Sequence, residues 1–222
     1  MQNTKLLIGV ILGTLILVVG VAVVFSKPAK TVTYDSQVVI GDERHATSSG
    51  QLSGAVASGS AQVVTKAVVV EFSDFQCPAC RAANPVVEQI INNAGGVVEL
   101  VYRDFPLESL HKNSKAAAIA AEAAGSLGKF WPYHEMLFEK QPDWAEESDP
   151  TPKFVEYAKQ VGLGEEGFRT AMESQEVVNL VQKDISDGNA LGVNATPTFF
   201  VDGEKVGLDQ LANVLQTKIE SN

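Results

Sequence analysis

The stretch "AVVVEF", Ala67 to Phe72, sets the tightest limit on the fold of this chain. A short, nearly unbroken apolar run is typical of a strand that is covered on both faces, because a strand with one wet face alternates apolar and polar residues. A sheet built around such a strand needs helices packed on both of its sides. We therefore expect a layered α/β domain.

The residues from Lys66 onward follow the order expected of such a domain. A turn and a helix ending at a double glycine, "CPACRAANPVVEQIINNAGG", come after the first strand, and "VVELVYRDF" reads as a second strand. Helical segments then fill about 114–191. The last part reads as a hairpin that turns at Asp202 and Gly203, followed by the helix "LDQLANVLQTKIE". The pattern predicts one compact domain over 66–222.

The beginning of the chain predicts a membrane anchor over residues 1–25. Leu6 to Phe25 is a run of 20 residues in which Thr14 is the sole polar one. At roughly 1.5 Å per residue, such a helix crosses a hydrocarbon core of about 30 Å. We predict an uncleaved, single-pass transmembrane helix. The alternative is a cleaved signal peptide, whose apolar region would be shorter and would end in a small-x-small site.

The segment 26–65 is predicted to be a flexible tether between this anchor and the domain. Its second half, "ATSSGQLSGAVASGSAQ", is uncharged and rich in Ser, Gly and Ala. A random coil of this length has a root-mean-square span of roughly 35 Å. The alternative is that Thr31 to Gly41, "TVTYDSQVVIG", forms a strand that joins the domain.

Charge and cysteine content exclude several classes of function. The formal net charge is −10 and no run of Lys and Arg interleaves with aromatics, so nucleic acid is not an expected partner. Both cysteines lie in one CxxC, Cys77 and Cys80. A tetrahedral zinc site needs four ligands, and the chain adds only three histidines, none in an HxxxH pair: His45, His111 and His134. We expect no metal; an inert structural bridge stays as another alternative.

The CxxC opens a helix, and this position predicts two unequal thiols. Unpaired backbone N–H groups and the helix dipole stabilise a thiolate at the first cysteine, Cys77, which we predict to be acidic and exposed. Pro78 suits the first helical position and is followed by Ala79. Cys80, one turn later, lies close enough to form a ring with Cys77 and is predicted to be more buried. Thiol–disulfide exchange needs this asymmetry.

Four stretches of the sequence resemble the DsbA-like thiol–disulfide oxidoreductases, particularly their membrane-anchored or secreted bacterial branch. They are "VEFSDFQCPAC", "YRDFPL", "AAEAAGSLGKFW" and "LGVNATPTFFVDG", and they occur in the family's order. The resemblance covers about Val64 to Ile219. It implies a thioredoxin-like fold with an inserted helical subdomain at about 114–191, which matches the helical segments found there.

The resemblance also implies roles for individual residues. Cys77 corresponds to the nucleophilic cysteine and Cys80 to the resolving one, and the Cys77–Cys80 disulfide is the redox-active group, so that no separate cofactor is expected. Thr196 and Pro197 match the family's loop that faces the cysteines, in which the proline peptide bond is cis. The sequence by itself permits that isomer without showing it.

Glu71 lies inside the first strand, six positions before Cys77, and matches an acidic residue that in many family members lies beneath the active site and helps to move protons. A buried carboxylate without a partner is costly, which indicates proton transfer or a paired charge. Exposure at the edge of the strand is the alternative. The dipeptide Pro78–Ala79 lacks the histidine that strongly oxidising members often carry, so the sequence leaves the strength of oxidation open.

Three hypotheses of function follow. The first is an oxidase that donates its Cys77–Cys80 disulfide to exported proteins with free thiols and is reoxidised by a quinone-linked membrane partner, DsbB-like or equivalent. The second is a reductase or isomerase that uses the same cysteines, and the third is a tethered binding or chaperone module. A disulfide donor is useful only outside the reducing cytosol. We therefore expect the domain on the extracytoplasmic side of the cell membrane; a cleaved signal peptide would instead make it secreted or periplasmic.

Overall fold

The structure, a computed structural model, describes residues 46–47 and 65–221. The predicted span, Leu6 to Phe25, and most of the predicted tether lie outside these residues. None of the helices in the described part of the chain is long and apolar enough to cross a bilayer. Within the predicted tether, Ala46–Thr47 forms a short strand, β1, that pairs antiparallel with β3 (Val98–Asp104). This piece of 26–65 therefore pairs with the sheet. The stretch 31–41, which the sequence analysis gives as an alternative strand, lies outside the described residues.

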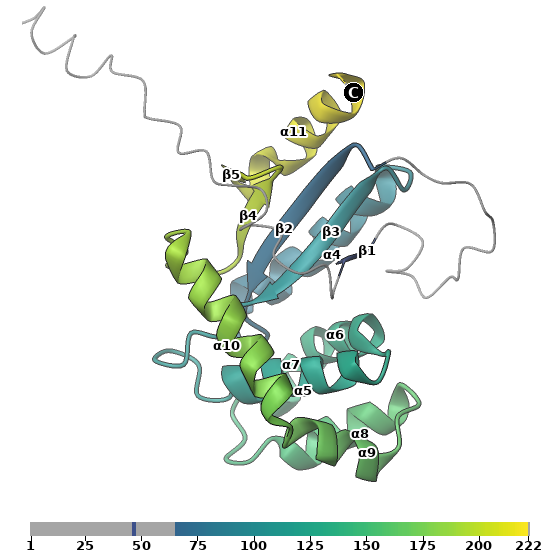
Figure 1. Ribbon diagram of the computed structural model, residues 1–222, viewed down its shortest axis with the longest axis vertical. Coiled ribbons are helices and arrows are strands. Elements are labelled where there is room, and N and C mark those ends of the chain that lie inside the picture. Colours follow the sequence, from purple (N-terminus) through teal and green to yellow (C-terminus); the bar gives the residue numbers. More distant parts are fainter. Residues whose placement is uncertain (1–45, 48–64, 222) are drawn as a thin grey trace, which may run out of the picture. The chain divides into compact units, whose positions relative to one another are not determined.

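The centre of the fold is a mixed sheet with the strand order β1-β3-β2-β4-β5 (Figure 1). β2 (Ala67–Ser73) is parallel to β3 and antiparallel to β4 (Thr198–Val201), which pairs antiparallel with β5 (Glu204–Val206). All residues of β2 except Val68 are buried. The prediction of a strand covered on both faces is confirmed.

Two helices cover one face of the sheet. α4 (Pro78–Asn93) contributes Val87 and Ile91, and α11 (Leu208–Ser221) contributes two buried leucines. These side chains pack against residues from the strands: Val69, Leu100, Phe199 and Val201. Val86, the apolar residue next to Val87 in the same helix, is 43% exposed.

The opposite face packs against the end of α10 (Gln175–Ala190) and the loop after it. Gly188 of α10 lies against the aromatic rings of this face. A Cβ atom at this position would lie 2.6 Å from the ring of Phe105 and 3.2 Å from that of Phe72. The close approach of helix and sheet therefore requires glycine at position 188.

Six helices lie between β3 and β4 in the described chain. They are α5 (Ser114–Ser126), α6 (Phe130–Glu139), α7 (Gln141–Trp144), α8 (Thr151–Gln160), α9 (Glu165–Met172) and α10. Figure 1 shows α5 to α9 gathered beyond the arrow ends of β2 and β3. The core of this group joins the buried alanines of α5 to aromatic side chains such as Tyr133, Trp144 and Phe154.

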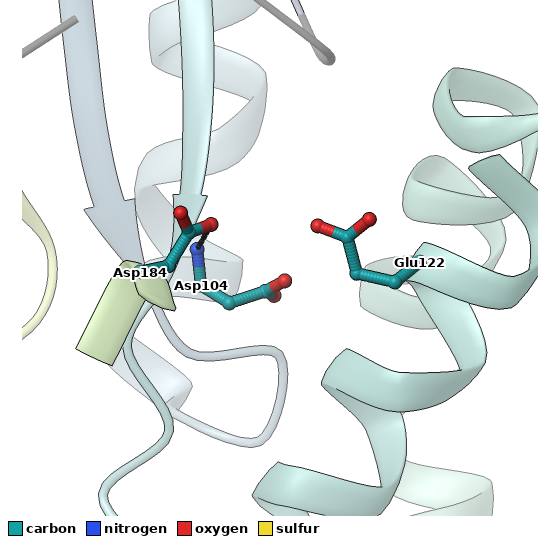
Figure 2. Close-up of side chains that lie close together, drawn as sticks. All are labelled: Asp104, Glu122 and Asp184. Atoms are coloured by element: carbon teal, nitrogen blue, oxygen red, sulfur yellow. Dashed lines mark hydrogen bonds between the residues drawn. The ribbon is translucent and has the colours of Figure 1, made fainter. Parts of the chain in front are cut away.

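A buried polar cluster connects these helices to the sheet (Figure 2). Carboxylate oxygens of Asp104, Glu122 and Asp184, which come from β3, α5 and α10, lie within 4.8 Å of one another. The backbone N–H of Asp104 donates to Asp184 Oδ2 at 3.1 Å, and Arg103 Nε donates to Asp184 Oδ1 at 2.6 Å. Among the described residues this is the one group whose spacing suits a metal ion, and it contains neither cysteine nor histidine.

The hairpin between β4 and β5 turns where the sequence predicted. Asp202 has φ 48° and Gly203 has φ 85°, the left-handed conformations that a two-residue hairpin turn requires. The turn is further fixed by the Asp202 carboxylate, which accepts a 2.9 Å hydrogen bond from the backbone N–H of Val68.

Candidate active site

Cys77 lies at the junction between the loop after β2 and the first turn of α4. Its backbone has φ −71° and ψ 122°, which is extended, and Pro78 occupies the first helical position. The N–H of Cys77 donates to the carbonyl of Asp74 at 3.0 Å, and the Cys77 carbonyl accepts from the N–H of Arg81 at 3.1 Å. The sulfur therefore lies at the positive end of a 16-residue helix, as the sequence predicted.

The pKa values of the two thiols are shifted in opposite directions. Hydrogen bonds from the Cys80 thiol, from the N–H groups of Cys80 and Ala79 and from Thr196 outweigh burial and lower the pKa of Cys77 from 9.0 to about 5. Burial raises the pKa of Cys80, and the bond that Cys80 donates to Cys77 raises it further. The sulfurs are not bonded to each other in the structure. The site thus holds one thiol that ionises readily and one that resists ionisation.

The predicted exposure of Cys77 is wrong, whereas that of Cys80 is right. Cys77 is 7% exposed and Cys80 is fully buried. Cys77 is covered because the loop before β4 approaches it: the Cys77 sulfur lies 3.6 Å from the carbonyl oxygen of Thr196. Pro78 and Ala79 are exposed, so a partner can reach the edge of the sulfur beside this dipeptide.

The loop between α10 and β4 is the one that the resemblance places opposite the cysteines. The Thr196–Pro197 peptide bond is cis, which is the isomer that the resemblance implies. Thr196 is 9% exposed, and its carbonyl oxygen faces the Cys77 sulfur. This loop therefore presents a backbone acceptor beside the first cysteine.

Glu71 is buried beneath the site, which excludes the alternative of exposure at a strand edge. It is 3% exposed, and its neighbours across β2 are Tyr102 on β3 and Phe199 on β4. Burial raises the pKa of Glu71, although Ser73 and His134 act in the opposite direction. The charge of Glu71 in turn contributes to the raised pKa of Cys80.

Asp74 holds the loop that precedes Cys77, and the sequence did not single it out. One carboxylate oxygen accepts from the backbone N–H of Gln76 at 2.8 Å. The other oxygen accepts from the N–H of Leu107 at 2.9 Å and lies 2.7 Å from His111 Nδ1. Asp74 is 1% exposed, whereas a solvated loop was the ordinary expectation for an aspartate next to a CxxC.

Two side-chain amides, one from α7 and one from the loop itself, hold the same loop in place. Gln141 Nε2 donates to the carbonyls of Phe75 and Cys77 at 2.7 Å and 3.1 Å. Gln76 donates to the carbonyl of Ala145 at 2.7 Å and accepts from the backbone N–H of Asn113 at 2.7 Å. Such contacts join residues 37 to 69 positions apart, and no local pattern in the sequence could have revealed them.

The two described histidines, His111 and His134, have other partners than the sulfurs. His134 is 2% exposed and lies among aromatic rings, 4.8 Å from Tyr102 and 5.4 Å from Phe75 between ring centroids. Its Nδ1 atom lies 3.1 Å from Glu135. His111 binds Asp74, as described above, and His45 lies outside the described residues.

Comparison with known proteins gives the same assignment as the geometry. Residues 57–221 match the profile of a protein family described as Thioredoxin. A thioredoxin-like oxidoreductase from Silicibacter pomeroyi is 26% identical, covering 84% of this chain and 98% of its own with a TM-score of 0.63. Oxidised BdbD from Bacillus subtilis is also 26% identical, covering 70% and 89% with a TM-score of 0.61.

Curated relatives match over a smaller share of their length. The Na(+)/H(+) antiporter NhaA 1 of Mycolicibacterium vanbaalenii is 38% identical over 138 residues, which are 61% of this chain and 22% of the antiporter. The chain thus spans about a fifth of the length of these relatives, and the match gives no ground for ion transport. The family profile and the solved structures, together with the paired thiols at a helix N-terminus, show that the chain belongs to the thioredoxin family, among its DsbA-like thiol–disulfide oxidoreductases.

Proposed function

We propose that this protein is a membrane-tethered oxidase that donates the Cys77–Cys80 disulfide to exported proteins. The observation that carries the proposal is the asymmetry of the two thiols, with the pKa of Cys77 at about 5 and that of Cys80 raised. An enzyme that gives away its disulfide needs a first sulfur that is stable as a thiolate and a second one that is shielded from clients.

The exchange proceeds in two steps. A client thiolate attacks the Cys77 sulfur of the disulfide, the Cys77–Cys80 bond breaks, and Cys80 leaves as a thiolate that takes up a proton. A second client thiolate then attacks the client sulfur of the mixed disulfide, and Cys77 leaves as a thiolate. The client loses two electrons and forms a disulfide, and the enzyme becomes the dithiol.

The low pKa of Cys77 favours this direction of exchange. Stabilising the Cys77 thiolate stabilises the reduced enzyme relative to its disulfide, which makes the disulfide easier to reduce and therefore a better oxidant. Hydrogen bonds from the Cys80 thiol and from backbone N–H groups supply this stabilisation in the structure. A reductase would instead need a disulfide that is hard to reduce.

Glu71 is proposed to donate a proton to Cys80 during reduction of the disulfide and to accept it during reoxidation. Because burial raises the pKa of Glu71, the carboxyl can hold a proton and pass it to the Cys80 thiolate as that sulfur leaves. The same group can accept the proton when Cys80 is oxidised again. The charge of Glu71 contributes to the raised pKa of Cys80, which supports this role.

Clients, reoxidation and location complete the proposal. Clients are exported proteins with free thiols, because disulfides persist only outside the cytosol. A quinone-linked partner in the membrane removes the two electrons from the dithiol, and the Cys77–Cys80 disulfide is the redox-active group that it restores. The predicted span, Leu6 to Phe25, would hold the domain at the outer side of the membrane.

Equilibration of the full-length protein with glutathione tests the direction of exchange. After acid quenching and alkylation, the ratio of dithiol to disulfide gives the reduction potential. We expect a bridge that is much easier to reduce than thioredoxin's, for which the potential is about −270 mV. A potential near that value would replace the oxidase by the reductase. Cys77→Ser should abolish exchange; if the variant instead keeps the full activity of the wild type in cells, the binding module replaces the oxidase.

A further inference from the structure

A groove with a volume of about 420 Å³ begins beside the reactive sulfur. Ala79, which lies between Pro78 and Cys80 in the chain, is part of its wall. Pro197 is part of it as well, and it follows Thr196, whose carbonyl oxygen faces the Cys77 sulfur. A client chain whose cysteine reaches Cys77 can therefore lie along this groove. The inference below concerns the clients of that same site, and it rests on the proposed function.

The residues that line the groove are mostly apolar, and those contributed by α4 are small. Ala79 and Ala83 come from α4, Phe199 from β4 and Val206 from β5. Two alanines one turn apart leave a shallow space that a larger apolar side chain of a client can fill. Burial of a leucine-sized side chain in such a space favours binding through the hydrophobic effect.

Lys205 on β5 is the one charged residue in the lining of this groove. It is exposed, and its ammonium group forms no ion pair or hydrogen bond with the described residues. Most other lysines of the described chain are paired with carboxylates: Lys112, Lys115, Lys140, Lys153, Lys159, Lys183 and Lys218. Asp209, in the first turn of α11, lies against Gly207 of the lining and forms no ion pair with Lys205.

We propose that this groove selects clients whose cysteine is flanked by an apolar residue and, within four positions, by a carboxylate. The apolar side chain packs over Ala79 and Ala83, and the carboxylate pairs with Lys205. The protein as a whole is acidic, with a formal net charge of −10, so an unpaired lysine here provides an attraction that the surrounding surface does not.

The size of the effect follows from the exposure of Lys205. Ion pairs at exposed positions are weak and screened by salt. We expect a preference of about two- to fivefold in the rate constant for an acidic over a basic client. Loss of the apolar neighbour should slow oxidation about three- to tenfold, because part of one leucine side chain is buried.

The test uses four synthetic dithiol peptides and the oxidised full-length protein. Three peptides carry leucine beside the first cysteine and Glu, Gln or Lys three positions away; the fourth carries Glu with serine in place of leucine. The second-order rate constant for peptide oxidation is divided by that with hydroxyethyl disulfide, an uncharged reference, which removes the effect of the neighbouring charge on the peptide's own thiols.

Two charge reversals separate the inference from a general effect of charge. Lys205→Glu should invert the preference for Glu over Lys, and Lys159→Glu, which changes the net charge equally in α8, should leave it as in the wild type. Sodium chloride at high concentration should reduce the wild-type preference toward one. Equal preferences in Lys205→Glu and the wild type, or equal rates with leucine and serine, would overturn the inference. If no peptide is oxidised at all, the proposed function itself fails.

Discussion

Replacing Cys80 by alanine should raise the pKa of Cys77 by a defined amount. In the reduced protein the Cys80 thiol donates a hydrogen bond to the Cys77 sulfur, and this bond is the largest contribution to the low pKa of about 5. Alanine removes the donor and keeps the buried position apolar. The contributions from the N–H groups of Cys80 and Ala79 and from Thr196 persist, because backbone and loop are unchanged.

The magnitude follows from the strength of one hydrogen bond to a charged group. Such bonds contribute about 1.5–3 kcal/mol, and one pKa unit corresponds to about 1.4 kcal/mol. The pKa of Cys77 should therefore rise by about one to two units in Cys80→Ala. It should stay well below the value of a free thiol, about 8.5, since the helix N-terminus still stabilises the thiolate.

Thiolate absorbance in the ultraviolet, followed against pH, measures this pKa directly. The rate of alkylation by iodoacetamide gives an independent value, and Cys77→Ala supplies the baseline because its remaining thiol should not titrate at acid or neutral pH. A pKa that stays at about 5 in Cys80→Ala would show that the bond between the thiols does not set the acidity. A pKa near 8.5 would show that the helix N-terminus contributes nothing.

Three further substitutions test the buried polar groups. Because burial raises the pKa of Glu71, the wild type should lose stability as pH rises from the ordinary glutamate range through this raised pKa. Glu71→Gln should remove that loss, so that its melting temperature gains more at pH 8 than at pH 5. Arg103→Met should lower the free energy of unfolding by about 3–5 kcal/mol, measured in urea, because it leaves Asp184 buried without its guanidinium. Asn113→Ala, which removes the donor to the carbonyls of residues 144, 145 and 147, should cost about 1–3 kcal/mol in the same assay.

The secondary structure could be predicted where the decisive interactions are local. The unbroken apolar run of β2 and the Asp202–Gly203 turn each require only neighbouring residues, and both were predicted correctly. The buried side of α4 could not be chosen from the apolar residues alone. The core takes Val87 and Ile91, one turn apart, and leaves Val86 outside. The difference depends on where α11 and the sheet lie, which the helix sequence does not contain.

The candidate site was predictable to the same extent. The CxxC and the helix that it opens are adjacent in the chain, so the acidity of Cys77 and the burial of Cys80 followed from position. The burial of Cys77 depends on Thr196, 119 residues away, and for this reason its exposure was predicted wrongly. Asp74 and Gln76 are indistinguishable from solvated loop residues until their partners are known, and those partners are supplied by distant segments.

The inserted helices and the thioredoxin-like core act on different atoms of the same cysteine. The loop at Thr196 faces the sulfur, whereas Gln141 donates to the carbonyl of Cys77, which also accepts the first helical hydrogen bond from Arg81. N–H groups lower a pKa only while they point at the charge, so a fixed backbone is a condition for the acidity of the thiol. Gln141 reaches the backbone carbonyl of Cys77, and it is not one of the residues that line the groove beside Ala79. The insertion therefore contributes to the chemistry of Cys77 through its backbone.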